Sequence, residues 1–400
     1  MGTHAIRDRT AITGIGCTDI TKRSGRTVLS LATEAGLRAV ADAGLEPTDI
    51  DGLVTFYWGR RDTPAPYELA NSLGLTSCHM SYCDSGGGAW ACSAIAAAAM
   101  AVYSGMCRHV LVYRAANSRS EPFPLEGLDA WPSGQRQWSE PFGATHAAAL
   151  YGPYVTAYMQ HYGVDNADFA PLAVQQRANA GLNRKALMTE PMSVEDHQES
   201  PWIIHPFRRL DCSIWNDGAM AVVVSSTEDA RRLPQSPVTI RAMEGGTLAA
   251  PVKARTSRHH WELNASLAAR SLYMKAGVTA DDIDIAELYD PFTGMALLHI
   301  EQFGLTPAGQ APDRIRDGEL SLDGRIPVNT HGGHLSEGNL AGLGHVVEAV
   351  QQLREDGVAD DHCPGAHDYD RQHCRQVRAP ELALVASESG DSALILGRAA

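Results

Sequence analysis

An internal repeat is the feature that most restricts how this chain can fold. Residues 31–54 (LATEAGLRAVADAGLEPTDIDGLV) and 264–288 (NASLAARSLYMKAGVTADDIDIAEL) superimpose at a constant offset of 233 positions. Each copy has the pattern of an amphipathic helix, a glycine stop, an acidic turn and a strand. The chain is therefore expected to contain two similar halves.

Short β-branched runs alternate with longer Ala-rich runs around both copies, which predicts βαβ units on mixed sheets covered by helices. We expect one half at residues 1–230 and the other at 236–400, with a polar, Pro-containing join at about 228–236. Residues 115–205 interrupt the first half and are rich in apolar side chains. We interpret them as an insertion that covers the substrate and contacts a second subunit.

Composition excludes several classes of function. A net charge of −14 argues against a nucleic-acid or anionic-membrane surface, since both require clustered Lys and Arg. The N-terminus lacks the apolar segment of a secretory signal, and no stretch is apolar for the roughly 18 residues that a membrane span needs. Eight cysteines without disulfide-framework spacing predict reduced thiols. These observations predict a cytoplasmic enzyme without a membrane span.

Three motifs give the chain a family resemblance: Asn216-Asp217-Gly218-Ala219, Tyr289-Asp290-Pro291-Phe292 and the run 329–345, NTHGGHLSEGNLAGLGH. Together with the repeat, they resemble the thiolase superfamily, specifically its sterol-carrier or lipid-transfer type thiolase-like proteins. The resemblance covers nearly the whole chain. It implies an α/β thiolase fold, with two repeated βαβαβαββ halves in a layered α-β-α-β-α arrangement.

The family's catalytic positions are altered in this chain. In thiolases the nucleophilic cysteine lies seventeen residues before the glycine that ends a buried helix, and counting back from Gly105 gives Gly88. Asn339 occupies the position of the catalytic histidine, and Ser387–Asp391 replace the final catalytic cysteine motif. Thiolysis and Claisen condensation need both cysteines. The resemblance therefore implies a thiolase fold without thiolase chemistry.

The pattern Tyr-Asp-x-Phe without a nucleophilic cysteine resembles the aldolases that remove side chains from steroid acyl-CoA thioesters. Those aldolases carry a second tyrosine where this chain has Asn339, so the resemblance does not extend to a relay of two tyrosines. Retro-aldol cleavage needs a base at the β-hydroxyl and donors to the enolate oxygen. Tyr289 takes the catalytic position and is expected to be that base, provided that neighbouring donors depress its pKa. The donors to the enolate oxygen are expected among Asn339, His334 and His331. Asp290, Gly88, Gly332, Gly333 and Gly338 complete the expected substrate-binding set.

Other interpretations remain open from the sequence. Cys83-Asp84-Ser85-Gly86 mimics the thiolase Cys-x-Ser-Gly signature, so Cys83 is either the nucleophile of a thiolase-type acyltransferase or a residue near a strand end. His146 is either an alternative acid–base group or an ordinary helix-start histidine. Tyr289 and the loop histidines have structural interpretations too, as a core tyrosine and turn residues. A third function is a non-catalytic subunit that binds acyl-CoA and scaffolds another protein.

The resemblance also implies partners. The substrate would carry coenzyme A or a carrier protein's phosphopantetheine, with no tightly bound cofactor. A homodimer is expected, with the strand at about Ser77–Cys83 pairing across the two-fold axis, as is a small OB-fold, zinc-containing acyl-CoA-binding partner. The segment 361–375 contains Cys363, His367, His373 and Cys374 but matches no common zinc module, so we predict no metal and either a polar surface loop or an insertion that contacts a partner.

Overall fold

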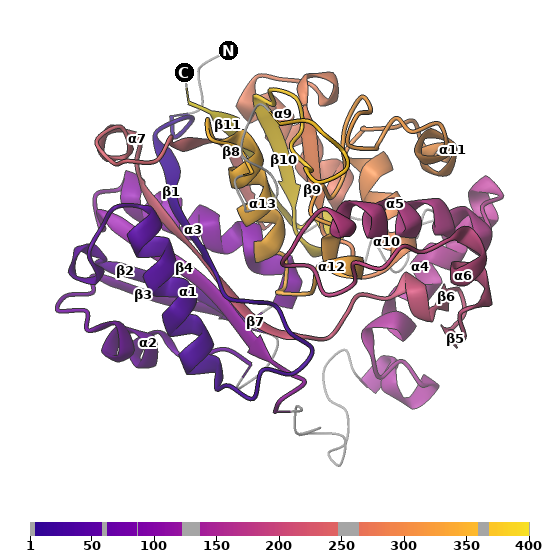
Figure 1. Cartoon of the computed structure of the whole chain (residues 1–400), viewed down its shortest axis with the longest axis horizontal. Coiled ribbons are helices and arrows are strands. Elements are labelled where there is room, and N and C mark those ends of the chain that lie inside the picture. Colours follow the sequence, from indigo (N-terminus) through magenta and orange to yellow (C-terminus); the bar gives the residue numbers. More distant parts are fainter. Residues whose placement is uncertain are drawn as a thin grey trace.

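The computed structural model describes residues 5–57, 62–85, 87–121, 137–246, 264–358 and 368–399. Within these ranges the strands form a nine-stranded mixed sheet in the order β3-β2-β4-β7-β1-β8-β11-β10-β9 (Figure 1). A small two-stranded sheet lies apart from it. The strands are β1 (Thr10–Cys17), β2 (Gly52–Tyr57), β3 (Met80–Ser85), β4 (His109–Asn117), β5 (Trp202–Ile204), β6 (Phe207–Arg208), β7 (Asp217–Ser226), β8 (Val238–Gly245), β9 (Ile285–Leu288), β10 (Leu382–Ala386) and β11 (Ser392–Arg398).

The predicted repeat appears as a symmetry of the sheet about the β1–β8 pair. These two strands pair antiparallel, with Ala11 opposite Thr239 and Ile12 opposite Val238. Outward from β1, β7 is antiparallel, β4 is antiparallel to β7, and β2 is parallel to β4. Outward from β8, β11 is antiparallel, β10 is antiparallel to β11, and β9 is parallel to β10, which repeats the pattern of the first half.

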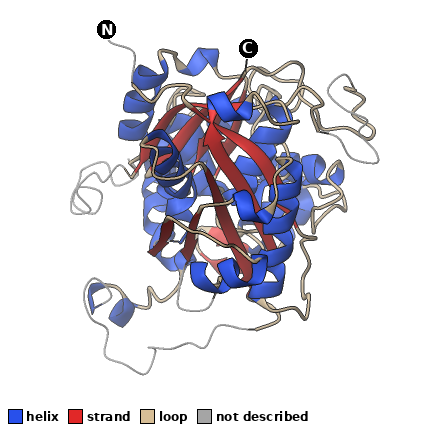
Figure 2. Ribbon diagram, turned by 90° about the vertical axis from the view of Figure 1, so that its left-hand side faces the viewer, coloured by secondary structure: helices blue, strands red, loops and turns tan. Residues whose placement is uncertain are grey.

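Helices cover the strands on both sides (Figure 2), and the hydrophobic clusters divide them into one central and two outer helical layers. The central layer holds α3 (Ala91–Tyr103) and α13 (Leu343–Leu353), whose side chains share one core with strands of both halves. The outer layers are α1 (Val28–Asp42) and α2 (Pro66–Leu73) on one half, with α9 (Ala265–Ala276) and α10 (Thr293–Gln302) on the other. The predicted thiolase fold is therefore confirmed.

The sequence of α3 explains its central place. The segment ACSAIAAAAMAVY is apolar around most of its circumference, and nine of its residues are buried. A helix that is apolar on all sides is stable only when it is enclosed, and small Ala side chains let strands approach from two directions. This helix positions the residues just before it against the second half of the molecule.

The segment between β4 and β7 lies beside the second half (Figure 1). It contains α4 (Ala147–Tyr162), α5 (Ala170–Gly181) and α6 (Val194–Glu199). Asn179 of α5 donates to the Asn329 carbonyl at 3.1 Å, and Asn183 donates to Glu337 at 2.9 Å. The insertion therefore holds the glycine-rich loop in place. The other α-helices in the described ranges are α7 (Thr227–Ala230), α11 (Ala311–Arg316) and α12 (Gly333–Ser336).

One expectation about the cysteines is wrong. Cys374 is disulfide-bonded, whereas Cys17, Cys78, Cys83, Cys92, Cys107 and Cys212 are free thiols. Spacing along the chain does not report which sulfur atoms the fold brings within bonding distance. Of the proposed metal-loop residues, Cys363 and His367 lie outside the described residues, and His373 pairs with Asp368 at 2.6 Å. None of the helices in the described ranges is long and apolar enough to span a bilayer.

Candidate active site

Tyr289 lies where β9 ends, at the boundary between the two halves. Its backbone N–H donates to the Ala386 carbonyl at 3.0 Å, which continues the β9–β10 ladder by one residue. The side chain is fully buried, and its ring meets His334 edge-on with centroids 4.5 Å apart. Among the described residues, the Tyr289 hydroxyl has no hydrogen-bond partner. Such a buried, unsatisfied hydroxyl is available to a ligand.

Gly88 lies directly against this hydroxyl. It belongs to the short 3₁₀ turn Gly87–Trp90 that leads into α3, so the central helix starts at Ala91, three residues after the expected nucleophile position. A Cβ on Gly88 would lie 2.1 Å from both the hydroxyl oxygen and Cζ of Tyr289. No side chain fits at position 88 while Tyr289 is in place.

The electrostatics of Tyr289 differ from the sequence-based expectation. Burial raises the pKa of Tyr289 well above its usual value, and the carboxylates of Glu388 and Asp290 raise it further. Arg114 and the Asn339 amide act in the opposite direction and do not compensate. The expectation that neighbouring donors depress this pKa is therefore wrong. In this structure Tyr289 is a neutral phenol at physiological pH.

Asp290 anchors the glycine-rich loop over the end of β9. Its two carboxylate oxygens accept the backbone N–H groups of His334, at 2.9 Å, and Leu335, at 3.2 Å. A Cβ on Gly333 would lie 2.2 Å from Asp290 Oδ2, and one on Gly332 would lie 2.6 Å from Ala180. Asp290 is fully buried and its oxygens are occupied by the loop. We therefore place it behind the expected substrate-binding surface.

The histidines of the loop form a buried network with carboxylates. His331 Nδ1 lies 2.9 Å from Glu287 Oε2, and its Nε2 lies 3.6 Å from Glu337. Burial alone would lower the pKa of His331, but Glu337 and Glu287 outweigh it and raise that pKa to about 10. His345, whose Nε2 lies 3.3 Å from Asp290, was not predicted from the sequence. Its signal is weak, since its nearest neighbours in the helix, Gly344 and Val346, are not polar.

The pKa of His334 is shifted in the direction opposite to that of His331. Burial, and then the nearby His345 and His331, lower the pKa of His334 well below its usual value. Its Nε2 accepts the backbone N–H of Gly342 at 3.2 Å, which fixes the ring against Tyr289. His334 is therefore a neutral imidazole that supports the tyrosine ring.

The same network contains two overlapping sets of metal-ligand atoms. Glu287, His331 and His345 form one set, Asp290, His334 and His345 form the other, and the atoms of each set lie within 4.8 Å of one another. All five residues are buried. In the structure, His331 and His345 face carboxylates that balance their charge. The absence of a metal remains a prediction.

Asn339 is held beside Tyr289 by the Asn-Asp-Gly-Ala motif. Its backbone N–H donates to Asn216 Oδ1 at 2.6 Å, and its amide donates to Ser213 Oγ at 3.2 Å. Gly338 permits this approach, since it has a φ of 150° and a Cβ there would lie 2.7 Å from Ile20. The structure thus brings Asn339, Tyr289 and Gly88 to one place.

Cys83 and His146 are both exposed. Cys83 stands on the edge strand β3, opposite Thr55, and is exposed. Partial burial and then Asp84 raise the pKa of the Cys83 thiol, so the thiolate that a nucleophile needs is disfavoured. His146 is exposed at the start of α4 and makes no side-chain cap. In the described part of the chain, neither residue has a hydrogen bond or ion pair to Tyr289.

Two further charged residues near Tyr289 escaped the sequence analysis. Arg114 on β4 pairs with Asp62 at 2.6 Å, with both side chains buried. Glu388 lies in the 3₁₀ turn Glu388–Gly390 after β10, where the Tyr151 hydroxyl donates to it. Burial raises the pKa of Glu388 to about 7. Glu388 could have been found from its position in the motif Ser387–Asp391, which replaces the family's final catalytic cysteine.

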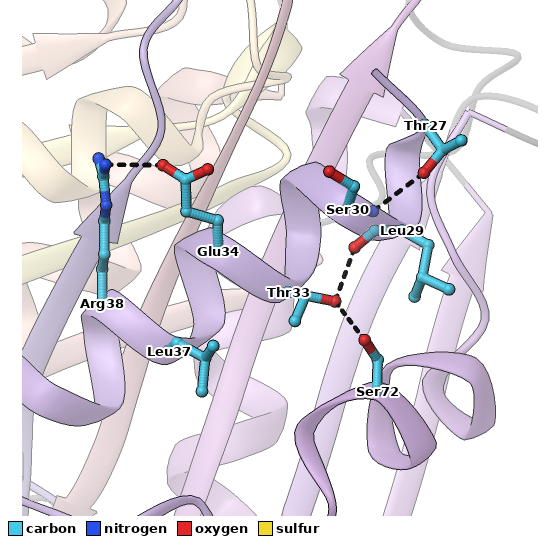
Figure 3. Close-up of a pocket in the computed structure, with 8 residues that line it drawn as sticks. All are labelled: Thr27, Leu29, Ser30, Thr33, Glu34, Leu37, Arg38 and Ser72. Carbon is cyan, nitrogen blue, oxygen red and sulfur yellow. Dashed lines mark hydrogen bonds and ion pairs between the residues drawn. The ribbon is translucent and has the colours of Figure 1, made fainter.

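A surface hollow also lies between α1 and α2, in the outer layer of the first half (Figure 3). Its polar side chains bind one another: Arg38 pairs with Glu34 at 2.7 Å, and Thr33 bonds to Ser72 at 2.7 Å. Tyr289 does not line it. The hollow therefore has no connection with the residues that gather around Tyr289.

Comparisons with known proteins identify the family of this chain. Residues 252–366 match the family described as Thiolase C-terminal domain-like. The steroid side-chain-cleaving aldolase of Thermomonospora curvata is 40% identical over 87% of this chain and 91% of its own length. The chain belongs to the thiolase superfamily, in the branch of the thiolase-like aldolases.

Two other relatives support the same assignment. The 17-hydroxy-3-oxo-4-pregnene-20-carboxyl-CoA lyase of Mycobacterium tuberculosis is 39% identical over 87% of this chain and 92% of its own. A solved Ltp2-ChsH2(DUF35) aldolase is 36% identical, with a TM-score of 0.88 over 99% of both chains. The predicted resemblance to the sterol-carrier type branch is thus confirmed.

Proposed function

We propose that this protein cleaves, or in reverse forms, the bond between the α and β carbons of a β-hydroxyacyl thioester of coenzyme A. The observation that carries the proposal is the contact between Gly88 and Tyr289. It leaves no room for a nucleophile at the thiolase position and places a phenol there instead. Retro-aldol cleavage needs no acyl-enzyme, because the electrons of the broken bond pass directly into the enolate.

Tyr289 handles the proton at the β-oxygen in this proposal. Because the pKa of Tyr289 is raised, it enters the reaction as a phenol and gives up its own proton as it accepts that of the substrate. The Asn339 amide is the proposed donor to the thioester oxygen, where negative charge develops. His334 and His331 support these groups and make no contact with substrate.

The substrate class follows from the relatives. The names of the T. curvata and M. tuberculosis proteins specify a steroid side chain and a steroid carboxyl-CoA thioester. We propose a bulky β-hydroxyacyl-CoA for this chain, with no tightly bound cofactor. The acyltransferase alternative is disfavoured by the raised thiol pKa of Cys83.

The proposed assembly has two interfaces. The solved relative is a complex with a DUF35 protein, so we propose a small DUF35-type partner of the OB-fold class. We also propose a homodimer through β3, which forms one edge of the large sheet and exposes Tyr82 and Cys83. A cytoplasmic location fits an enzyme that uses acyl-CoA.

The test uses the chain co-expressed with a DUF35-type partner and 17-hydroxy-3-oxo-4-pregnene-20-carboxyl-CoA as the probe. Wild-type protein should release a ketone and a shortened acyl-CoA, and Tyr289→Phe should lower kcat by about 100-fold or more. Tyr273→Phe is the matched control, since Tyr273 donates to Phe303 away from this site. Unchanged turnover in Tyr289→Phe would indicate a scaffold subunit, and no cleavage by the wild-type complex would contradict the proposal.

A further inference from the structure

Glu388 converges with Tyr289 and Gly88 from a third element of the fold. Strands β9 and β10 are parallel, with Leu288 opposite Ala386, so the residues after both strands emerge at the same edge of the sheet. Ser387 Oγ accepts the backbone N–H of Cys92, in the first turn of α3. Ser387, the residue before Glu388, is thus bonded to α3, the helix that follows Gly88. Glu388 also lies beside the end of β9, where Tyr289 follows.

The Glu388 carboxyl is buried and has one defined partner. Its side chain is among the buried polar groups, and the Tyr151 hydroxyl donates to Oε1. Burial raises the pKa of Glu388 to about 7, with a smaller effect from Asp391, while the bond from Tyr151 opposes the rise. The charge of Glu388 in turn raises the pKa of Tyr289. Glu388 therefore acts on Tyr289, and of the two groups only Glu388 changes protonation state near neutral pH.

The proposed reaction requires such a group. In the cleavage direction, the O–H bond of the β-hydroxyl breaks, the Cα–Cβ electron pair passes into the thioester enolate, and the α-carbon then gains a proton. The overall reaction consumes no proton, because the one lost by the hydroxyl equals the one gained by the α-carbon. Tyr289 is a phenol and cannot keep a second proton. An acceptor must take its proton and later supply one to the carbon.

We propose that Glu388 is the second catalytic residue, which receives the proton of the β-hydroxyl by way of Tyr289 and delivers it to the α-carbon of the enolate. This inference rests on the proposed function. Tyr151 is a positioning residue that orients the Glu388 carboxyl through its hydroxyl. In the synthetic direction the same carboxylate removes the α-proton.

The test separates the α-carbon step from bond cleavage. Propionyl-CoA has an α-carbon but no β-hydroxyl, so its exchange of α-hydrogen for deuterium in D₂O reports the proposed role of Glu388 alone. In the complex with the DUF35-type partner, Glu388→Gln should lower both this exchange and turnover by about 100-fold or more. The control is Glu301→Gln, because Glu301 is half-buried and also accepts a tyrosine hydroxyl, that of Tyr158, at 2.7 Å.

The variant Tyr151→Phe tests whether Tyr151 orients the Glu388 carboxyl, because a purely structural role of Tyr151 would not change the pH dependence of kcat/KM. Loss of its hydrogen bond should raise the pKa of Glu388, so the limb of kcat/KM that rises through about pH 7 should move to higher pH. Glu388→Gln should lose that limb. The inference would be overturned if Glu388→Gln showed the same exchange and turnover as Glu301→Gln. It would also be overturned if the rising limb of kcat/KM stayed at the same pH in Tyr151→Phe. If the wild type exchanges propionyl-CoA but cleaves no β-hydroxyacyl-CoA, and Glu388→Gln loses exchange, the proposed function fails while the role of Glu388 stands.

Discussion

The hydroxyl oxygen of Tyr289 lies 2.1 Å from the point where a Cβ on Gly88 would stand. Nonbonded carbon and oxygen atoms do not approach each other so closely. A tyrosine at position 289 therefore requires a glycine at position 88. A covalent nucleophile at position 88 and the buried phenol are mutually exclusive. This pair explains in steric terms why the chain combines a thiolase fold with aldolase relatives.

Gly88→Ala should therefore destabilise the protein and abolish turnover. The methyl group forces Tyr289 from its place, and overpacking of this kind costs about 1–3 kcal/mol. Urea unfolding of Gly88→Ala measures the loss, and the double variant Gly88→Ala/Tyr289→Ala should show less destabilisation than the sum of its parts. Gly181→Ala is the control, because its Cβ would meet its nearest neighbour at an ordinary 3.4 Å. Strict additivity in the double variant would show that the two residues do not share this space.

Cys83→Ala should leave turnover unchanged. The thiol is exposed on β3, and its raised pKa disfavours the thiolate at neutral pH. Intact-protein mass spectrometry with an acyl-CoA should show no added acyl mass on the wild type. Loss of turnover in Cys83→Ala together with a detectable acyl-enzyme would restore the acyltransferase interpretation.

The sequence predicted the scaffold of the site better than its electrostatics. The repeat and the motifs were sufficient to bring Tyr289, Gly88 and Asn339 together, because each is tied to a strand end, helix start or glycine-rich turn. The pKa of Tyr289 was predicted with the wrong sign. Burial raises this pKa most, and the Glu388 carboxyl, which raises it further, is brought close only by the pairing of β9 with β10.

His345 escaped detection for a related reason. It lies in α13 among apolar residues, where a single histidine is compatible with an ordinary core position. Its contacts with Asp290 and Glu287 join a helix to the end of a strand. Local patterns describe one element at a time, so a network that crosses several elements is visible only in three dimensions.

The ion pairs of His331 should make stability depend on pH in the alkaline range. The pKa of His331 is raised from 6.5 to about 10 in the folded protein, so its contribution is complete below about pH 6.5 and is lost as pH rises toward 10. Urea unfolding at pH 6.5, 8 and 9.5 should show falling stability in the wild type and a shallower fall in His331→Gln. Some slope should remain, because the pKa of His345 is also raised. Parallel curves for the two proteins would contradict the assignment.

Asp290→Asn should be among the most damaging isosteric changes in the chain. Asp290 accepts two backbone N–H groups and faces His345 at 3.3 Å, whereas an asparagine offers one oxygen and turns an NH₂ group toward a donor. Removal of one partner of a buried ion pair costs about 3–5 kcal/mol. The loop should loosen, and kcat should fall together with the denaturation midpoint.

Asp281→Asn is the matched control for that change. Asp281 is also a carboxylate paired with a basic side chain, Arg325 at 3.6 Å, but its own side chain is 92% exposed. Water screens such a pair, so this variant should unfold at the wild-type urea concentration. Asp290 holds the loop that lies against Tyr289, and its charge acts on Tyr289. The kcat of Asp290→Asn should therefore fall even at temperatures where the variant remains fully folded. Wild-type kcat in folded Asp290→Asn would show that the carboxylate serves folding alone.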